Sequence, residues 1–380
     1  MFKALSGAFL DELLSIKKSF YKLSLITILP LLCFGLIIGI FYGGVLRNIP
    51  VIAVDNDKSK FSEKLLFNIQ SSPTIDIKYR LNSLKKASDI LKQGSAYGII
   101  VVPKNFMRDT LMQKQPKVTV MLNTQYILIG KMLTSAFMGS VMQSAAEVEY
   151  VKNLTTLQNP HATLNSVAPI KLQVTPFFNT YQNYFLFLVS AILPAIWQIF
   201  IVVATIVSFG LLFKSGKEYE FFSGGFIEMK IIGKLLPYTF AYLLIGILFL
   251  YYIYGVLGWA FQGSFTLVFF AMFLSVVAYQ GVALLFFVTG FDYARSLSLG
   301  AVYTAPAFAF LGVTFPIYNM NEFALLWRDL LPISHYMEIQ ISQANYGLDG
   351  FLEMDKLLLI VCFWLVFIPV FYMFKRRVVR

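Results

Sequence analysis

Residues able to do chemistry are sparse in this sequence, and they do not form a catalytic set. A phosphate-binding loop needs the pattern G-x-x-x-x-G-K-[ST]. The nearest stretch, Ser215-Gly216-Lys217-Glu218, has the wrong spacing and ends on Glu218. The motifs H-E-x-x-H of zinc hydrolases and G-x-S-x-G of serine hydrolases are absent from the sequence. We therefore expect that this polypeptide does not hydrolyse ATP by itself.

The sequence also lacks a pattern of residues that would bind a metal ion or form a disulfide framework. The run Asp55-Asn56-Asp57 resembles the start of a calcium loop, but that loop needs glycine sixth and a carboxylate twelfth, where Lys60 and Leu66 stand. We predict instead a turn at the end of a strand, with Asp57 or Ser59 capping the next helix. The cysteines (Cys33, Cys362) lie in apolar runs and the histidines (His161, His335) lie far apart, so we expect no bound metal.

The segment Lys214–Lys234 mixes charged and aromatic residues and is broken by Gly224-Gly225. A connector between antiparallel helices needs only about 2–8 residues, so this loop is long for that purpose. One interpretation is a short helix whose aromatic face binds a partner protein. The other is an interfacial loop whose phenylalanines enter lipid. Under the first, the contacts come from Lys217, Glu218, Glu220, Phe221, Phe222 and Gly224.

Long apolar runs on both sides of this loop predict a membrane protein. A helix needs roughly 20 apolar residues to cross a hydrocarbon core. We predict six transmembrane helices, a first at Leu23–Tyr42 and a five-helix bundle within residues 184–380, at Tyr184–Phe213, Leu235–Ala260, Phe265–Phe291, Ser296–Phe315 and Leu357–Phe374. The first run lacks a clear signal-peptide cleavage site, so we expect a retained anchor.

The predicted spans carry no ionisable residue well inside them. Ion-coupled transporters usually place such residues at membrane depth, so any transport energy is expected to enter from outside the membrane. The main polar groups left are Gln198, Thr205, Gln280, Thr289 and Thr304. Gln198, Gln280 and Thr304 are candidates for lining a substrate pathway. The alternative is that these groups only bridge neighbouring helices by hydrogen bonds.

Composition and charge agree with a membrane protein. The chain is 58% hydrophobic and 13% charged, with a mean hydropathy of +0.69. Basic residues cluster beside span ends, which is typical of orientation signals rather than of nucleic-acid binding. Residues 43–183 carry eight of the eleven net positive charges, but long loops cross the membrane largely regardless of charge. We therefore expect both termini, the loop 214–234 and the turn Asp292–Arg295 to be cytoplasmic. Residues 1–22 are predicted to form an amphipathic helix, either lying on the membrane surface or simply leading into the first span.

Between the first and second spans, residues 43–183 change character. Short β-type runs at Val51–Asp55, Ile75–Tyr79, Gly98–Val102 and Val118–Leu122 alternate with helical runs at Lys58–Gln70, Ser83–Gln93 and Lys104–Gln113. This alternation predicts an extracytoplasmic α/β domain. A long helix follows at Tyr126–Leu157, packing on its own domain or on a partner, and then a linker at Asn159–Pro176.

The segment 316–356 is too broken to be a further span. Two short amphipathic pieces, Phe323–Leu331 and Tyr336–Tyr346, are separated by Pro332. Apolar stretches this short favour an interfacial or re-entrant hairpin. Such a hairpin could close the outer end of a pathway, with Pro316, Pro332, His335 and Tyr336 as the candidate gate residues.

Several motifs, in this order along nearly the whole chain, resemble the membrane subunits of type-2 ABC exporters, in the branch with a large extracytoplasmic domain after the first span. They are PVIAVDNDKSKFSEKL at Pro50–Leu65, AYGIIVVPKNF at Ala96–Phe106, the Gly-Lys-x-x-Pro of Gly233–Pro237, Phe315-Pro316-Ile317, and the run Leu331–Tyr336. One departure concerns the loop. Leu212-Phe213-Lys214 stands where many members have an Arg-Glu pair, and only Gly216-Lys217-Glu218 fits the Gly-Thr-x-Glu that follows it.

The resemblance implies a permease in a bacterial inner membrane that pairs with a second permease copy, itself or a paralogue. It implies ATPase subunits that bind ATP and Mg²⁺, with residues 1–22 and 214–234 passing their motion to the spans. Family analogy adds a periplasmic adaptor protein and a drug-like or lipid-like cargo exported from the cytoplasm or inner membrane, as in multidrug efflux.

Two other classes are open from the residues alone. A membrane-anchored sensor would bind its ligand on the α/β domain, but it would need a larger cytoplasmic output domain. A lipid-modifying enzyme would need clustered ionisable residues at the membrane interface, which only Glu322, Asp329, His335 and Glu338 could supply.

Overall fold

The computed structural model describes residues 1–112, 114–157, 178–179 and 183–378, without the side chains of 151–157. The expected linker Asn159–Pro176 and His161 lie outside the described residues. The chain divides into two compact units. One consists of Met1–Gly44 together with Phe177–Arg380, and the other of Val45–Pro176.

The first unit is helical. Its amino-terminal part is α1 (Phe2–Lys18), α2 (Phe20–Ile26) and α3 (Ile28–Phe41), with breaks at Ser19 and Thr27. The remainder is α9 (Tyr184–Lys214), α10 (Glu218–Phe222), α11 (Ile227–Leu250) with a π-helical turn (Tyr251–Val256), α12 (Phe265–Val288), α13 (Tyr293–Thr304), α14 (Ala307–Phe310), α15 (Glu322–Asp329), α16 (Pro332–Ile341), α17 (Met354–Cys362) and α18 (Phe367–Val378).

Within the described residues, five helical stretches are long and apolar enough to cross a membrane: Phe20–Phe41, Tyr184–Lys214, Ile227–Val256, Phe265–Val288 and Gly350–Val378. The predicted span Ser296–Phe315 is not one helix. It is divided into the 12 residues of α13 and the 4 residues of α14. Pro306 lacks the N–H that would continue the helix, and Gly312 adopts a left-handed φ of +80°.

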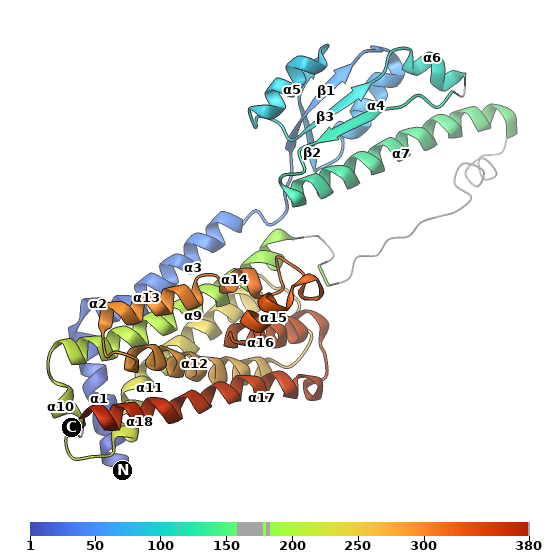
Figure 1. Ribbon diagram of the computed structural model, residues 1–380. Helices are drawn as coiled ribbons and strands as arrows, with labels where there is room; N and C mark the ends of the chain where they lie inside the picture. The colour runs from blue at the N-terminus through green and yellow to red at the C-terminus, as the bar shows by residue number, and fades with distance from the viewer. Residues whose placement is uncertain (113, 158–177, 180–182, 379–380) are drawn as a thin grey trace. The chain divides into compact units, whose positions relative to one another are not determined.

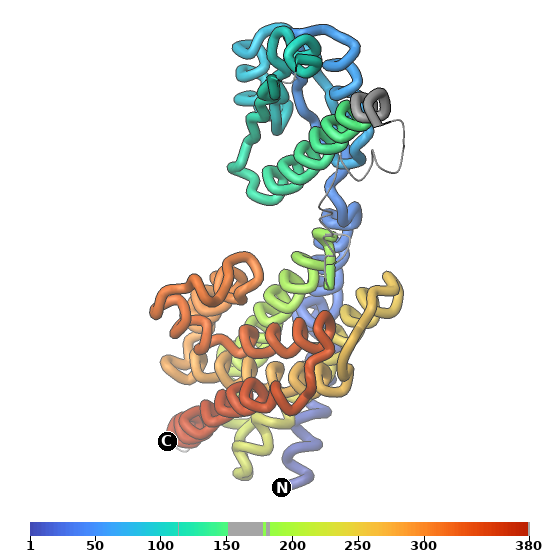
Figure 2. The backbone as a smooth tube through the Cα atoms, turned by 90° about the vertical axis from the view of Figure 1, so that its right-hand side faces the viewer, coloured from blue at the N-terminus to red at the C-terminus, as the bar shows by residue number. Residues whose placement is uncertain are grey.

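The helices of this unit run back and forth between two ends (Figures 1 and 2). Both chain termini and α10 lie at one end, which we call the terminal end, and α14 to α16 lie towards the other. The central helices are α12 and α9, with 72% and 61% of their most apolar windows buried. The first and last spans are peripheral, at 28% and 22%, so most of their residues are at least partly exposed and can meet lipid or another chain.

Caps fix where these helices begin. The Asn183 side chain accepts hydrogen bonds from the amides of Phe185 (2.9 Å) and Leu186 (3.3 Å) at the start of α9. Ser264 caps α12, and Asp292 caps α13 by accepting from Arg295 N at 2.6 Å. A helix leaves its first amides without intrahelical partners, so these short polar side chains define the helix starts.

The second unit is a four-stranded sheet with strand order β2-β1-β3-β4. The strands β1 (Ile49–Asp55), β2 (Ile75–Leu81) and β3 (Gly98–Val102) are parallel, and β4 (Thr119–Leu122) pairs antiparallel with β3. The helices α4 (Lys60–Gln70) and α7 (Ile127–Leu157) share an apolar cluster with one face of the sheet, and α5 (Leu84–Lys92) shares one with the other. α6 (Phe106–Leu111) follows β3.

The turn after β1 is built as the sequence suggested. Ser59 caps α4 by accepting from Ser62 N at 3.2 Å, and Ser62 Oγ accepts in return from Ser59 N at 2.9 Å. Asp57 instead reaches across to α6, accepting from Met107 N at 3.0 Å. Burial alone would raise the pKa of Asp57, but hydrogen bonds from Ser59 and from the backbone at the start of α6 outweigh it and lower the pKa. Asp57 therefore caps the first turn of α6, whereas Ser59 caps α4.

Candidate functional site: a buried ion cluster beside the 214–234 loop

A carboxylate lies buried at the terminal end of the helical unit. Glu12 of α1 accepts hydrogen bonds from Lys22 Nζ at 2.7 Å, from Tyr238 Oη at 2.7 Å and from Ser208 Oγ at 3.0 Å. Its second oxygen is ion-paired with Lys234 Nζ of α11. The side chains of Glu12, Lys22 and Lys234 are only 3%, 6% and 4% exposed. The cluster therefore joins four helices, α1, α2, α9 and α11, through one carboxylate.

The spacing along α1 and one glycine on α11 make this approach possible. Ala8, Glu12 and Ile16 are the buried residues of α1, and their spacing of four places them on one helix face. Gly233 of α11 lies directly against that face. A Cβ at Gly233 would overlap the carbonyl oxygen of Leu5 and come within 3.0 Å of the Ala8 Cβ. The missing side chain thus lets α1 pack closely enough for Lys234 to reach Glu12.

The charges of the cluster do not balance. One carboxylate faces two ammonium groups, so the buried cluster carries one excess positive charge. Burial raises the pKa of Glu12, but the ammonium groups of Lys234 and Lys22 outweigh that effect and hold its pKa below the ordinary value. Glu12 is therefore a carboxylate at neutral pH. Removing one partner of a buried pair typically costs about 3–5 kcal/mol, because the charge left behind is unpaired.

The same lysine contacts the 214–234 loop. Lys234 Nζ lies 5.4 Å from the ring centre of Phe221 and 5.6 Å from that of Phe209, both within cation–π range. One turn earlier on α11, Lys230 Nζ donates to the carbonyl of Phe221 at 2.7 Å and to that of Ser223. The start of α11 thus holds the loop on one side and α1 on the other.

The predicted loop residues divide into inward-facing and outward-facing groups. Phe222 is only 2% exposed, packing in an aromatic cluster with Phe374 at a ring separation of 5.7 Å, and Glu218 is also buried. Phe221 is half-buried. The expectation that Phe222 offers an aromatic surface to a partner is therefore corrected, because its ring is used inside this chain. Lys217, Glu220 and Gly224 are exposed.

Two loop aromatics that the sequence analysis did not single out face outward. Tyr219 is 51% exposed and Phe226 is 55% exposed. Phe226 has a φ of +52°, in the left-handed region that bulky residues rarely adopt, and it follows Gly224 and Gly225 at +75° and +79°. Backbone in this region costs of order 1–3 kcal/mol, and it is enriched at functional sites. Tyr219, Glu220 and Phe226 thus belong to the exposed surface of the loop, together with Lys217 and Gly224.

The polar residues predicted to line a pathway bond to neighbouring helices. Gln198 Nε2 of α9 donates to the carbonyl of Thr304 at 3.4 Å, and Gln198 Oε1 accepts from Tyr279. The Tyr279 hydroxyl accepts from Ile333 N of α16 at 3.0 Å. Gln198 and Thr304 are thus brought together in one network.

Gln280 lies in a different network. Gln280 Oε1 accepts from Thr239 Oγ1 at 3.0 Å, and its Nε2 donates to the carbonyl of Leu235 at 3.3 Å. These bonds match the bridging interpretation, and the role of all three residues in a pathway stays a prediction.

Helix α16 belongs to the segment predicted to be interfacial or re-entrant, and most of its residues are buried inside the helical unit. Pro332 is the first residue of α16, which its fixed φ and missing N–H favour, so it begins the second piece rather than separating the two. His335 and Tyr336 are 3% and 1% exposed, and His335 Nε2 lies 3.1 Å from the carbonyl oxygen of Asp329. Pro316 precedes a short 3₁₀ turn and is exposed. The gate role of these residues stays a prediction.

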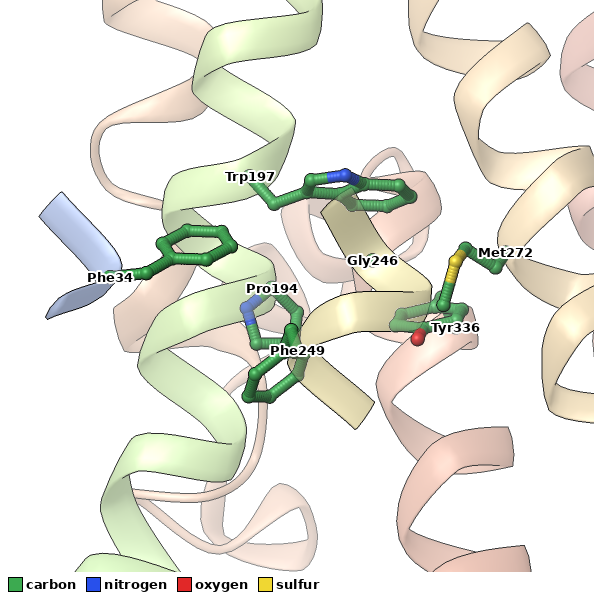
Figure 3. A pocket seen from close by; sticks show the side chains of 7 residues that line it. All are labelled: Phe34, Pro194, Trp197, Gly246, Phe249, Met272 and Tyr336. Carbon is green, nitrogen blue, oxygen red and sulfur yellow. The ribbon is translucent and has the colours of Figure 1, made fainter. Parts of the chain in front are cut away.

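Tyr336 also borders a small apolar cavity of about 10 Å³, close to the minimum for a single water molecule. Figure 3 shows its aromatic rings around this space. The remaining lining residues come from α3, α9, α11 and α12: Phe34, Pro194, Trp197, Gly246, Phe249 and Met272. In this state of the protein the cavity is too small for a drug-sized or lipid-sized molecule.

The ionisable residues near α15 and α16 are largely paired with each other. Arg328 pairs with Glu338 and lies 3.5 Å from Asp329, while Lys356 contacts Glu353 at 2.8 Å and Glu338 at 3.8 Å. Carboxylates engaged in this way stabilise the packing of α15, α16 and α17. This arrangement does not favour the lipid-modifying enzyme considered from the sequence.

These features define a multi-pass helical membrane protein with a polar joint at one end of its helices. The sequence matches the family model described as ABC-2 family transporter protein over residues 20–374, so the chain belongs to that family. No curated protein matches the sequence significantly. Members are membrane components of ABC transporters, which work with an ABC ATPase, rather than enzymes in their own right.

The ion cluster was not found from the sequence. The sequence predicts one amphipathic helix over residues 1–22 and does not show that Glu12 is buried. Glu12 is 2% exposed, whereas Phe2 and Leu13 of α1 and Phe20 of α2 are exposed. The available signal was a carboxylate four residues from both Ala8 and Ile16, which turn out to be buried. The Gly233-Lys234 motif was noticed as a family resemblance without a role, and the structure supplies one.

Proposed function

We propose that this protein is the permease subunit of an ATP-driven exporter in a bacterial cytoplasmic membrane. The cargo would be hydrophobic or amphipathic, drug-like or lipid-like. ATP and Mg²⁺ would bind on a separate ATPase subunit. The observation that carries the proposal is the family match over residues 20–374, together with a terminal end where a mobile partner would reach α1, α10 and α11 at once.

Six crossings, with both termini cytoplasmic, account best for the helical unit. Five crossings would leave the termini on opposite sides, whereas the N- and C-termini lie at the same end in Figure 1. The stretch formed by α13 and α14 supplies the additional crossing as a broken helix packed along α9. Irregular backbone at membrane depth is tolerated where protein covers it.

The exposed surface of the 214–234 loop is the proposed contact with the ATPase. Aromatic residues are over-represented among the side chains that dominate binding energy at interfaces. Tyr219 and Phe226 are exposed, while the rings of Phe221 and Phe222 pack against each other on the inner side of the loop. Glu220, also exposed, adds a charge that can pair with a basic residue of the partner.

A second permease copy, identical or a paralogue, would complete the pathway. The peripheral helices offer the free apolar surface. On α3, Leu32, Leu36 and Ile40 are 56%, 55% and 66% exposed and share one helix face. Membrane lipid covers such a face in the absence of a partner. A periplasmic adaptor would contact the α/β unit, which the proposed topology locates outside the cytoplasm.

The proposal is tested with inside-out vesicles that contain this chain and its proposed ABC ATPase partner. ATP should drive uptake of an amphipathic probe such as ethidium, or transfer of a fluorescent short-chain phospholipid. Vesicles in which the phosphate-loop lysine of the ATPase is replaced serve as the control. Uptake of either probe at the same rate in both preparations would contradict ATP-driven export.

A further inference from the structure

The ion cluster around Glu12 lies where the loop, the amino-terminal helix and the first span meet. Contacts lead from Phe221 of α10 to Lys234 of α11, from Lys234 to Glu12 of α1, and from Glu12 to Lys22 of α2. Each contact after the first is made between side chains at most 6% exposed. A displacement of the loop is therefore transmitted through buried, charged contacts rather than through flexible surface side chains.

We infer that Glu12 is a positioning residue that joins α1, α2, α11 and the adjoining part of α9 into one rigid body, which pivots against α3 at Thr27. The inference rests on the proposed function, because it describes how motion of the ATPase reaches the first span. Thr27 is the first break in the chain beyond the cluster. Its φ and ψ of −135° and −74° belong to neither helix nor strand.

The physical argument for rigidity is the cost of separation. Moving α1 away from α11 would break the Glu12–Lys234 ion pair and leave the buried ammonium group of Lys234 without a carboxylate, which is strongly unfavourable. The close contact at Gly233 prevents α1 from sliding closer. The α1–α11 contact is consequently a poor hinge.

The end of α2 is fixed to the same body. The Tyr242 hydroxyl donates at 3.1 Å to the carbonyl of Leu25, and lies 2.9 Å from the carbonyl of Phe200 on α9. Lys22 reaches back to α1, contacting Ser15 Oγ at 2.9 Å as well as Glu12. Both ends of α2 are thus attached before the Thr27 break. The pivot is placed at Thr27 rather than at Ser19, because the cluster bridges Ser19.

The inference is tested by distances between spin labels in the purified permease, with Cys33 and Cys362 replaced by serine. One label pair, at Lys17 and Leu244, lies within the proposed body, and a second, at Lys17 and Ile40, spans Thr27. All three label sites are exposed. In the permease bound to its ATPase, trapping with ATP and vanadate should change the second distance and leave the first unchanged. A change in the first distance would overturn the rigid body.

Variants test Glu12 in the permease alone, so the result does not depend on the ATPase. Glu12→Gln should broaden the Lys17–Leu244 distance distribution, whereas Asp11→Asn, an exposed carboxylate next to it, should not. In the variant E12Q/K22Q the cluster keeps one net positive charge, as in the native protein. It should still show the broadening, because the bond to Lys234 has lost its charge. A native-like distance distribution in E12Q/K22Q would mean that Glu12 only offsets the charge of the lysines and does not hold α1 against α11. That result would overturn the inference.

Failure of the proposed function gives a different result. If the ATPase does not bind the native permease, the export proposal fails. The Lys17–Leu244 distance distributions of the Glu12 variants still decide whether Glu12 holds α1 against α11.

Discussion

Substituting Gly233 by alanine tests the packing that brings Lys234 to Glu12. The added methyl would lie 3.0 Å from the Ala8 Cβ and overlap the Leu5 carbonyl, whereas carbon atoms in contact normally lie about 3.5–4.0 Å apart. Helix α1 must therefore move outward by roughly 0.5–1 Å. A shift of that size would stretch the Ser208–Glu12 bond of 3.0 Å beyond hydrogen-bond range.

Overpacking of this kind costs about 1–3 kcal/mol, partly offset by the roughly 0.5–1 kcal/mol by which alanine exceeds glycine in a helix. We expect a net loss of about 1–2 kcal/mol in the free energy that holds α1 in place, equivalent to local opening about 5- to 30-fold more often.

Hydrogen exchange of the α1 amides, measured by mass spectrometry on the purified protein, reports that opening directly. Gly7→Ala is the matched control, because it is the same substitution on α1 and a Cβ there meets nothing within 4 Å. It should slow exchange slightly or leave it unchanged. Native exchange rates in Gly233→Ala would refute the argument that Gly233 sets the α1–α11 distance.

Three further predictions concern partner, energy and topology. Replacing Tyr219 and Phe226 by alanine should abolish co-purification with the ATPase, at about 2 kcal/mol per aromatic contact, while Phe222→Ala should mainly lower the melting temperature of the permease. ATP-driven probe uptake into inside-out vesicles should survive an uncoupler that collapses the proton gradient, and loss of uptake at constant ATP would identify a different energy source. A cysteine at Asp349 should react with an impermeant thiol reagent on intact cells and one at Lys217 should not; the reverse labelling would overturn the orientation.

The α/β unit could be predicted closely from the sequence because its signals are local. The strand predicted at Gly98–Val102 is observed with those bounds, and the long helix begins within one residue of its predicted start. Alternation of short β-branched runs with amphipathic helical runs is visible within each segment, and Ser59 is a local cap signal.

The break in the stretch Ser296–Phe315 and the burial of Phe222 could not be predicted from such local signals. Apolar composition is continuous from Ser296 to Phe315, so it could not show that Pro306 and Gly312 end the helix before the run ends. An aromatic residue in a loop is equally suited to a partner's groove and to the chain's own core. Only the packing of Phe222 against Phe374 decides between them.

The burial of Glu12 could not be predicted because it depends on contacts with residues far away in the sequence. Its partners Ser208, Lys234 and Tyr238 lie 196, 222 and 226 residues away in the sequence. Without that tertiary context, a carboxylate beside Asp11 on an amphipathic helix is expected to face water. The family motif Gly233-Lys234 pointed to the right place, but its chemistry became clear only when α1 was found against it.

The central claim, that this chain is the permease subunit of an ATP-driven exporter, is tested most directly by ATP hydrolysis in proteoliposomes. The proposed ABC ATPase partner is purified and reconstituted with and without this chain, and vanadate-sensitive phosphate release is measured. We predict a stable complex of the two proteins whose hydrolysis rate differs at least several-fold from that of the ATPase alone. A permease that purifies without the ATPase and leaves its hydrolysis rate unchanged would contradict the claim.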